Sequence, residues 1–481
     1  MNYRFIINIL GFLLMLEGFF IALSSIISLI YRESDFWPLI ISSSISIFVG
    51  FFCWLFNRNI TREVGTREGY IVVSIGWILF SVFGAIPFYL SGAIPSYTDA
   101  FFETMSGFTT TGASILNDIE AIPHGLLFWR SLTQWLGGMG IIVLSLAILP
   151  LLGIGGMQLF VAEVPGIKAD KLHPRIKETA KRLWGIYLLF TFSETILLWI
   201  GGMTLFDAVN HAFTTMATGG YSTKQASISY WQSPFIHYVI TIFMIFAGTN
   251  FTLSYFALNR KFKKIWKDEE FRFYIGVILC FTFVVTLVLY LTQSFGIEKS
   301  FRDAFFQVVS IITTTGYMTV DYLLWGPFLI IVIFVAMFFG GSAGSTGGGM
   351  KIVRILLVLK NSILEMKRLI HPNAVIPVRY NKQTVSVSIM SNILAFIVIY
   401  ILIFVLGTLI MAGMGLDFES AMGSVVSSLG NIGPGIGTVG PAANFHDIPD
   451  AGKWFLSLLM LIGRLEIFTV LIILSPAFWK K

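Results

Sequence analysis

Charged residues are scarce in this chain of 481 residues. Asp, Glu, Lys and Arg together make up 12% of the sequence, about half the fraction of an average soluble domain. Six stretches contain none of these residues, and each is long enough to cross a hydrocarbon core of about 30 Å as a helix: 69–98, 131–162, 225–259, 273–297, 322–350 and 383–416. The scarcity excludes a soluble multidomain enzyme and predicts an all-α polytopic membrane protein.

Cysteine is almost absent, since Cys53 and Cys280 are the only two and both lie in apolar sequence. This excludes a disulfide framework and a thiolate metal site. The six histidines show no metal-ligand spacing either: His124, His173, His211, His237, His371 and His446. The N-terminus is apolar up to Ile30 and lacks a cleavage signal of small residues, so we expect a retained helix there.

Positive charge is present and unevenly distributed. Most of the 32 Lys and Arg residues fall in alternate connections, which are 57–69, 153–182, 259–272 and 350–385, and near the two ends. The positive-inside rule makes these segments cytoplasmic, with both termini inside and about ten crossings. The basic loops therefore fit lipid headgroups and a protein partner better than nucleic acid.

A unit of Asp, twelve residues and Gly occurs four times, each copy between two apolar spans. The copies run from Asp99 to Gly112, from Asp207 to Gly220, from Asp303 to Gly316 and from Asp417 to Gly430. The spacing predicts four pseudo-repeats of span, short helix, return loop and span around a central pore, after two N-terminal transmembrane helices. The predicted divisions are 1–69, 70–182, 183–270, 271–385 and 386–481.

The short segment has a physical interpretation. Asp is a favoured N-cap, and about ten helical residues span about 15 Å, half a bilayer. Such a segment must enter the membrane and return, and non-helical backbone at that depth is tolerated only inside protein or along a water-filled cavity. The repeated glycine predicts a positive φ or a close backbone approach. We therefore expect four loops to converge on a pore, with helix C-termini that favour a cation.

Two other features are singular. The apolar run from Pro327 to Phe339 is too short to complete a crossing, so the glycine-rich segment 340–349 should break the helix inside the membrane. An ordinary linker is the alternative. Arg464 lies in a span of roughly 454–474, where a charge is functional by default. Its alternative role is a structural ion pair with Glu466 or Glu194.

Two enzyme motifs occur without their context. Residues 340–344 fit G-x-S-x-G, but no acid and histidine follow in a recognisable order, although His371 is available. Residues 435–440 fit G-x-G-x-x-G without a βαβ unit. We expect no catalytic residues and no resident cofactor.

The four loop segments, together with GGMQLFVAEVPG at 155–166, GGSAGSTGGGMK at 340–351 and GNIGPGIGTVGP at 430–441, resemble the Trk/Ktr/HKT family of potassium transporters, of the bacterial TrkH type. The two extra N-terminal spans favour this type over the shorter KtrB type. The resemblance covers essentially the whole chain. It implies a homodimer with one pore per subunit, and a cytoplasmic TrkA-type ring of nucleotide-binding regulatory subunits.

The resemblance also implies a selectivity filter of main-chain oxygens that binds K⁺, the transported ion and the only metal. Its residues are Thr110, Thr111, Gly112, Thr218, Gly219, Gly220, Thr314, Thr315, Gly316, Leu429, Gly430 and Asn431. Gly112 favours potassium, because some plant relatives with Ser at this position prefer sodium. The fourth segment departs from the Thr-rich pattern.

The resemblance assigns an intramembrane gate to the glycine-rich segment and places Arg464 beside the ion path. The gate residues are Gly340, Gly341, Ser342, Ala343, Gly344, Ser345, Thr346, Gly347, Gly348, Gly349 and Arg464. The implied function is potassium uptake across the bacterial cytoplasmic (inner) membrane through a channel-like pore. A secondary transporter that couples K⁺ to Na⁺ or H⁺ is the alternative, and a membrane enzyme is a distant third.

Overall fold

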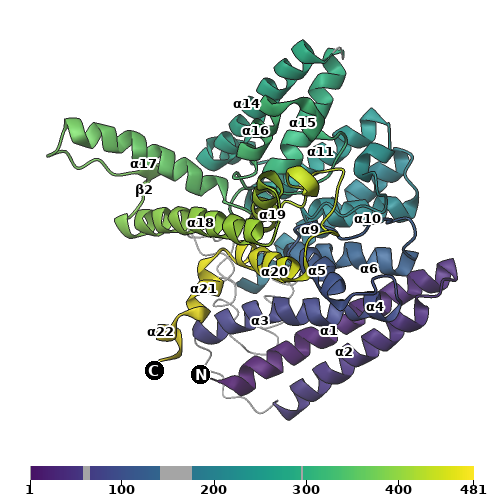
Figure 1. The fold of residues 1–481 in the computed structure, drawn as a ribbon. Coiled ribbons are helices and arrows are strands. Elements are labelled where there is room, and N and C mark those ends of the chain that lie inside the picture. Colours follow the sequence, from purple (N-terminus) through teal and green to yellow (C-terminus); the bar gives the residue numbers. More distant parts are fainter. Residues whose placement is uncertain (1, 58–65, 141–175, 294–295, 481) are drawn as a thin grey trace.

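The computed structural model describes residues 2–57, 66–140, 176–293 and 296–480 (Figure 1). The described part is almost entirely helical, and its strands are two residues long each. The all-α class predicted from the sequence is confirmed. The GGMQLFVAEVPG segment lies outside the described residues.

The chain begins with a helical hairpin. Its helices are α1 (Tyr3–Tyr31) and α2 (Phe36–Phe56), as predicted for the two N-terminal spans. They cross at two glycines, where a Cβ atom on Gly50 would lie 2.6 Å from the carbonyl oxygen of Gly11. Small residues at such crossings let apolar helices approach closely. The hairpin packs against α3 and α6.

Four successive sets of elements follow, each with a long helix, a short helix, a loop and a further helix. The first contains α3 (Thr66–Gly84), α4 (Ile86–Leu90), α5 (Tyr97–Phe108), α6 (His124–Trp135) and the π-helix η1 (Leu136–Gly140). The second contains α9 (Ile176–Ile200), α10 (Leu205–Met216), η2 (Ser227–Tyr230), α11 (Pro234–Gly248), α12 (Phe251–Leu258) and α13 (Phe262–Lys267).

The third set contains α14 (Glu269–Thr292), α15 (Ile297–Ile312), η3 (Tyr322–Trp325), α16 (Pro327–Ala336), α17 (Ile352–Ile370), β1 (Arg379–Tyr380) and β2 (Gln383–Thr384). The fourth contains α18 (Val387–Gly413), α19 (Phe418–Gly430), η4 (Gly437–Val439), α20 (Asp450–Arg464), α21 (Phe468–Leu474) and α22 (Pro476–Trp479). The predicted divisions at 182/183 and 270/271 fall inside α9 and α14, which begin a few residues earlier.

Six helices of the described part are long and apolar enough to cross a membrane, or eight if each bent pair is one span. The bent pairs are α11 with α12, at 111°, and α20 with α21, at 117°. The sequence predicts uninterrupted helices at both places. Between α20 and α21 the break is made by Glu466 and Ile467, which both have positive φ and begin two residues after Arg464.

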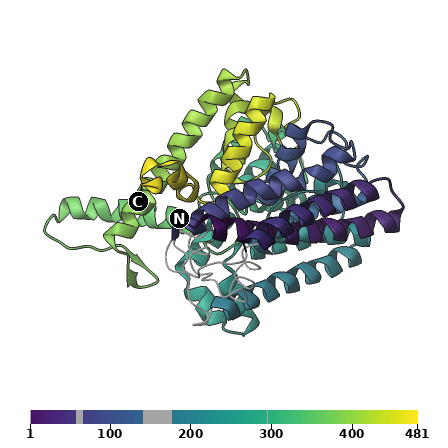
Figure 2. The ribbon, with the colours of Figure 1, turned by 90° about the horizontal axis from the view of Figure 1, so that it is seen from below.

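Helix α17 and the β-hairpin form an arm that projects from the helical body (Figures 1 and 2). In the hairpin, Arg379 pairs with Thr384 and Tyr380 with Gln383 in antiparallel register. The outer half of α17 exposes apolar side chains: Leu359, Ile363, Met366, Leu369 and Ile370. Both views show the two chain termini on the side of the body from which the arm extends.

Candidate ion filter and gate

The four short helices end in loops with the same backbone conformation. Each loop has a non-glycine residue with positive φ and, two residues later, a glycine with positive φ. The pairs are Thr110 (52°) with Gly112 (81°), Thr218 (54°) with Gly220 (76°), Thr314 (58°) with Gly316 (83°), and Asn431 (52°) with Gly433 (101°). Only a specific set of contacts keeps Thr in this region, because its branched side chain disfavours it.

A shared hydrogen-bond pattern holds this conformation. The N–H of Thr110 donates to the carbonyl oxygen of Gly107, and that of Thr111 donates to Ser106, at 2.9 and 2.8 Å. The equivalent residues of the other three loops make the same two bonds, three and five residues back along the chain. This is the Schellman arrangement, in which a left-handed residue ends a helix and satisfies its last carbonyls.

The fourth loop corrects the register predicted from the sequence. The glycine equivalent to Gly112 is Gly433, because Asn431 has the left-handed conformation and Gly433 the second positive φ. Gly430 is instead the last residue of α19, and Leu429 lies within that helix. The structure therefore brings Asn431, Ile432 and Gly433 into the loop position, and Ile432 and Gly433 were not among the predicted residues.

The loops pack into a closed ring. In each loop the carbonyl oxygen of the residue before the glycine abuts the glycine of the preceding loop. The distances from an added Cβ atom to the carbonyl oxygen of the next loop show this. They are 2.0 Å from Gly112 to Gly219, 1.9 Å from Gly220 to Thr315, 2.0 Å from Gly316 to Ile432 and 2.9 Å from Gly433 to Thr111. The order runs from loop 1 through loops 2, 3 and 4 and back to loop 1, so the four segments face one another. No other residue fits the first three positions without moving a neighbouring main chain.

Part of the ring is solvent-accessible. Gly112, Gly220 and Gly316 are partly exposed, although the threonines before them are fully buried. Side-chain amides also support the ring. Gln134 donates to the oxygen of Gly219 at 2.7 Å, and Asn431 donates to Thr111 Oγ1 at 3.0 Å.

The predicted capping role of the four aspartates is wrong for three of them. Ser96 and Thr204 are the N-caps of α5 and α10, so Asp99 and Asp207 are the third helical residues. Asp303 is the seventh residue of α15. Asp417 alone of the four is an N-cap and accepts from the N–H of Ser420 at 3.1 Å.

The glycine-rich segment breaks the helix as predicted, since α16 ends at Ala336 and α17 begins at Ile352. The segment lies directly against the ring loops. The N–H of Gly348 donates to Thr314 Oγ1 at 2.7 Å, and Thr346 Oγ1 donates to the carbonyl of Met216 at 3.0 Å. A Cβ atom on Gly348 would lie 2.8 Å from the oxygen of Gly430.

Arg464 ties this segment to the first set of helices. Its Nη1 donates to the carbonyl of Thr346 at 2.7 Å, and its Nη2 donates to Gly137 and Gly138 at 2.5 and 2.7 Å. Glu466, which we considered as an alternative partner of Arg464, forms a buried ion pair with Arg354. Glu194 is fully buried on α9.

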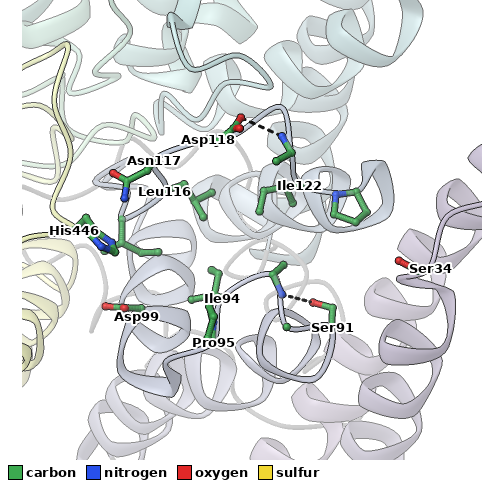
Figure 3. A pocket seen from close by; sticks show the side chains of 15 residues that line it. Ser34, Ser91, Ile94, Pro95, Asp99, Leu116, Asn117, Asp118, Ile122 and His446 are labelled. Carbon is green, nitrogen blue, oxygen red and sulfur yellow. Dashed lines mark hydrogen bonds between the residues drawn. The ribbon is translucent and has the colours of Figure 1, made fainter.

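A cavity of about 380 Å³ opens beyond the N-terminal end of α5 (Figure 3). Figure 3 shows Asp99, Asn117 and His446 along one side of it. Asp99 also accepts from Lys453 Nζ at 2.5 Å. Its lining also includes Ile115 and Leu116, three and four residues after Gly112, so the cavity extends from the N-terminal end of α5 to the segment that leaves loop 1. Within the described ranges, no group of three or more His, Cys, Asp or Glu residues is placed to hold a metal ion.

Comparisons with known proteins agree on one family. Residues 39–481 match the TrkH family, described as a cation transport protein. The chain is 42% identical to the Trk system potassium uptake protein TrkH of Salmonella typhimurium, and 34% identical to TrkG of Escherichia coli. The alignments cover 100% and 99% of each chain. The crystal structure of the potassium transporter TrkH from Vibrio parahaemolyticus superimposes with a TM-score of 0.90 at 40% identity, over 100% of both chains. The chain therefore belongs to the TrkH family of cation transport proteins.

Proposed function

We propose that this protein mediates potassium uptake across the bacterial cytoplasmic membrane through a channel-like pore. The observation that carries the proposal is the closed order of the four loops, in which each glycine abuts the carbonyl of the next loop. The names of its full-length relatives, which describe potassium uptake, support the same ion.

The proposed filter consists of the main-chain oxygens of Thr111, Gly219, Thr315 and Ile432. Carbonyl oxygens can replace the hydration shell of K⁺ when they surround it at a fixed distance. Four helices end at the ring, and the partial negative charge of each C-terminus favours a cation there. An inside-negative potential of 100 mV supplies about 2.3 kcal/mol per charge, so uptake needs no coupled ion.

The proposed gate is the segment from Gly340 to Gly349 together with Arg464. Its bonds to Thr314 and Met216 hold it against the ring, and Arg464 connects it to Gly137 and Gly138 of the first set. A cation that leaves the ring would meet both the segment and the positive guanidinium. At an effective dielectric constant of 20, two unit charges 4 Å apart repel by about 4 kcal/mol.

A chain of contacts joins the proposed gate to the arm. Glu270 Oε1 accepts from the N–H of Ala343 at 2.6 Å, and its Oε2 accepts from the hydroxyl of Tyr380 in β1 at 3.3 Å. A cytoplasmic TrkA-type ring that moved the arm would therefore pull on the gate segment. We expect Tyr380→Phe to weaken the response to such a partner about threefold without changing uptake in its absence.

The remaining features of the proposal concern assembly and orientation. The protein would act as a homodimer in the inner membrane, with K⁺ as substrate and no cofactor of its own. Both termini lie on the side of the arm, which supports placing them together with it in the cytoplasm (Figure 2). The four sets of elements would be pseudo-repeats around one pore.

Rubidium uptake into liposomes that contain the purified chain tests the function directly. We expect uptake that potassium competes strongly and sodium weakly. Equal competition by both ions would contradict the selective filter, and no competition by potassium would contradict the function. Unitary currents in a planar bilayer would separate a pore from a coupled transporter, which turns over slowly at a fixed ion ratio.

The gate is tested by deleting Gly344–Gly348. We expect a higher uptake rate in the absence of any cytoplasmic partner, because the segment no longer reaches Thr314 and Met216. Unchanged uptake by a correctly folded variant would contradict the gating role.

A further inference from the structure

One position on the short helices contacts the loop that follows it. It lies seven residues after Ser96, Thr204 or Ser300 and carries a different side chain in each of the first three sets. Glu103 accepts from Ser114 Oγ at 3.0 Å and from the N–H of Ile115 at 2.9 Å, His211 bonds Ser222 Oγ at 2.9 Å, and Gln307 donates to the carbonyl of Val320 at 3.2 Å. In the fourth set the helix and loop touch through backbone, because a Cβ atom on Gly435 would lie 2.6 Å from the oxygen of Gly423.

In the first two sets, the main-chain carbonyl at this position also accepts a hydrogen bond from the next loop. Tyr221, which follows Gly220 in loop 2, donates its hydroxyl to the carbonyl of Glu103 at 2.6 Å. Tyr317, which follows Gly316 in loop 3, donates to the carbonyl of His211 at 3.1 Å. Glu103 and His211 therefore each hold their own loop by the side chain and the following loop by the main chain.

Glu103 differs from its counterparts His211 and Gln307 because its carboxylate forms an ion pair. Its Oε1 lies 2.7 Å from Nε of Arg130 on α6, and the two side chains are 1% and 3% exposed. Arg130 reaches onward into loop 2, where Nη1 donates to the carbonyl of Ser222 at 3.0 Å. Its guanidinium carbon also lies 3.5 Å from the centre of the Tyr221 ring. The pair thus joins the segments that leave loop 1 and loop 2.

A buried ion pair is a weak source of stability, because desolvation of the two charges offsets most of their attraction. It does fix geometry, since each charged group demands several hydrogen bonds in set directions. Glu103 and Arg130 direct those bonds to Ser114, Ile115 and Ser222, all within three residues of a ring glycine. In the account of potassium filters that rests on cavity size, discrimination between K⁺ and Na⁺ depends on where the carbonyl oxygens are held.

We propose that Glu103 and Arg130 are a positioning pair that sets the ion preference of the ring by fixing loops 1 and 2 relative to each other. The proposal rests on the proposed function of the ring as a potassium filter. Neither residue touches the ion.

The test measures rubidium uptake with potassium and sodium competition in Glu103→Gln, Arg130→Met and the double variant. Each single variant leaves one buried group without its charged partner, so we expect a lower Tm and a preference for potassium over sodium that falls about fivefold to tenfold. The double variant leaves no unpaired charge. We expect its Tm to rise above that of either single variant while the preference for potassium stays low.

Glu298→Gln is the matched control. It is also an acid-to-amide change on a short helix, and it breaks the half-exposed pair of Glu298 with Arg302, whose Nε and Oε1 lie 3.6 Å apart. We expect wild-type preference. Folded variants that keep wild-type preference, or a double variant that regains preference together with Tm, would overturn the proposal. A wild-type chain without potassium-competed uptake would instead overturn the proposed function.

Discussion

The four ring loops are nearly alike, whereas the helices that follow them are interrupted in three different ways. Every loop repeats two positive φ values and two hydrogen bonds. After the loops, α6 passes into a π-helix, α11 and α12 bend by 111°, α16 gives way to the glycine-rich segment, and α20 and α21 bend by 117°.

The difference separates two tasks. A ring that surrounds one ion needs the same oxygen position from four directions, so its backbone repeats. The helices after the ring break in three different ways, since only the second and fourth sets share a sharp bend, and side chains there, such as Arg464 and Thr346, connect unlike partners. Symmetry therefore belongs to the proposed filter, and asymmetry to the proposed gate.

The largest effect should come from adding one methyl group to the ring. In Gly220→Ala the new carbon would lie 1.9 Å from the oxygen of Thr315, so the ring must open. We expect rubidium uptake or its preference for potassium to fall at least about tenfold. Gly92→Ala is the control, because Gly92 has a similar φ of 74° but no atom within 4 Å of the added carbon. Equal losses in both variants would assign the effect to backbone strain alone.

The register of the fourth loop is tested by two neighbouring glycines. In Gly433→Ala the added carbon would lie 2.9 Å from the carbonyl oxygen of Thr111, and the residue has a φ of 101°. In Gly430→Ala the residue is helical, and the nearest atom to the added carbon is the flexible end of the Ile432 side chain. We expect Gly433→Ala to impair ion preference severalfold more than Gly430→Ala. The reverse order, measured by the same competition assay, would restore the register predicted from the sequence.

Removing Arg464, which holds the gate segment, should raise uptake rather than lower it. Arg464→Ala loses the bonds to Thr346, Gly137 and Gly138, so we expect uptake without a partner to rise about tenfold. The exposed Arg272→Ala is the control and should leave uptake unchanged. A folded Arg464→Ala protein with slower uptake would mean that the arginine supports the pore rather than restrains it.

The smallest effect on uptake is expected from two aspartates with different roles, whose replacement should change stability instead. Asp417→Ala removes an N-cap, which should lower stability by about 1 kcal/mol. Asp99→Ala leaves the buried Lys453 with only the exposed Asp450, 4.0 Å away, and should cost more, about 3 kcal/mol. Hydrogen bonds from Ser420 lower the pKa of Asp417, so its contribution is present above pH 4 or so and is lost as the pH falls. Thermal unfolding of both variants at several pH values measures the difference.

The all-α class, the two N-terminal helices and the break at Gly340–Gly349 could be predicted, because uncharged length and glycine content act locally. The repeated spacing in the sequence also predicted the positive φ of three ring glycines. The fourth ring glycine was misplaced because Asp417 is the N-cap of its short helix, whereas Ser96 and Thr204 are the N-caps in sets 1 and 2. Counting from the cap instead gives sixteen positions to the ring glycine in each of these loops.

Other features could not be predicted because they depend on contacts between distant segments. Glu103 and Arg130 are 27 positions apart, and Ser222 is 92 positions beyond Arg130, so no local pattern joins them. The bend after Arg464 lies in an apolar stretch whose composition suits an unbroken helix. Glu466 and Ile467 take their positive φ where Glu466 meets Arg354 of another set.

The most direct measurement of the central claim is anomalous scattering from crystals grown in rubidium. We expect one strong peak inside the ring, bounded by the carbonyl oxygens of Thr111, Gly219, Thr315 and Ile432. A ring without rubidium, or a peak bound instead by acidic side chains away from it, would contradict the account.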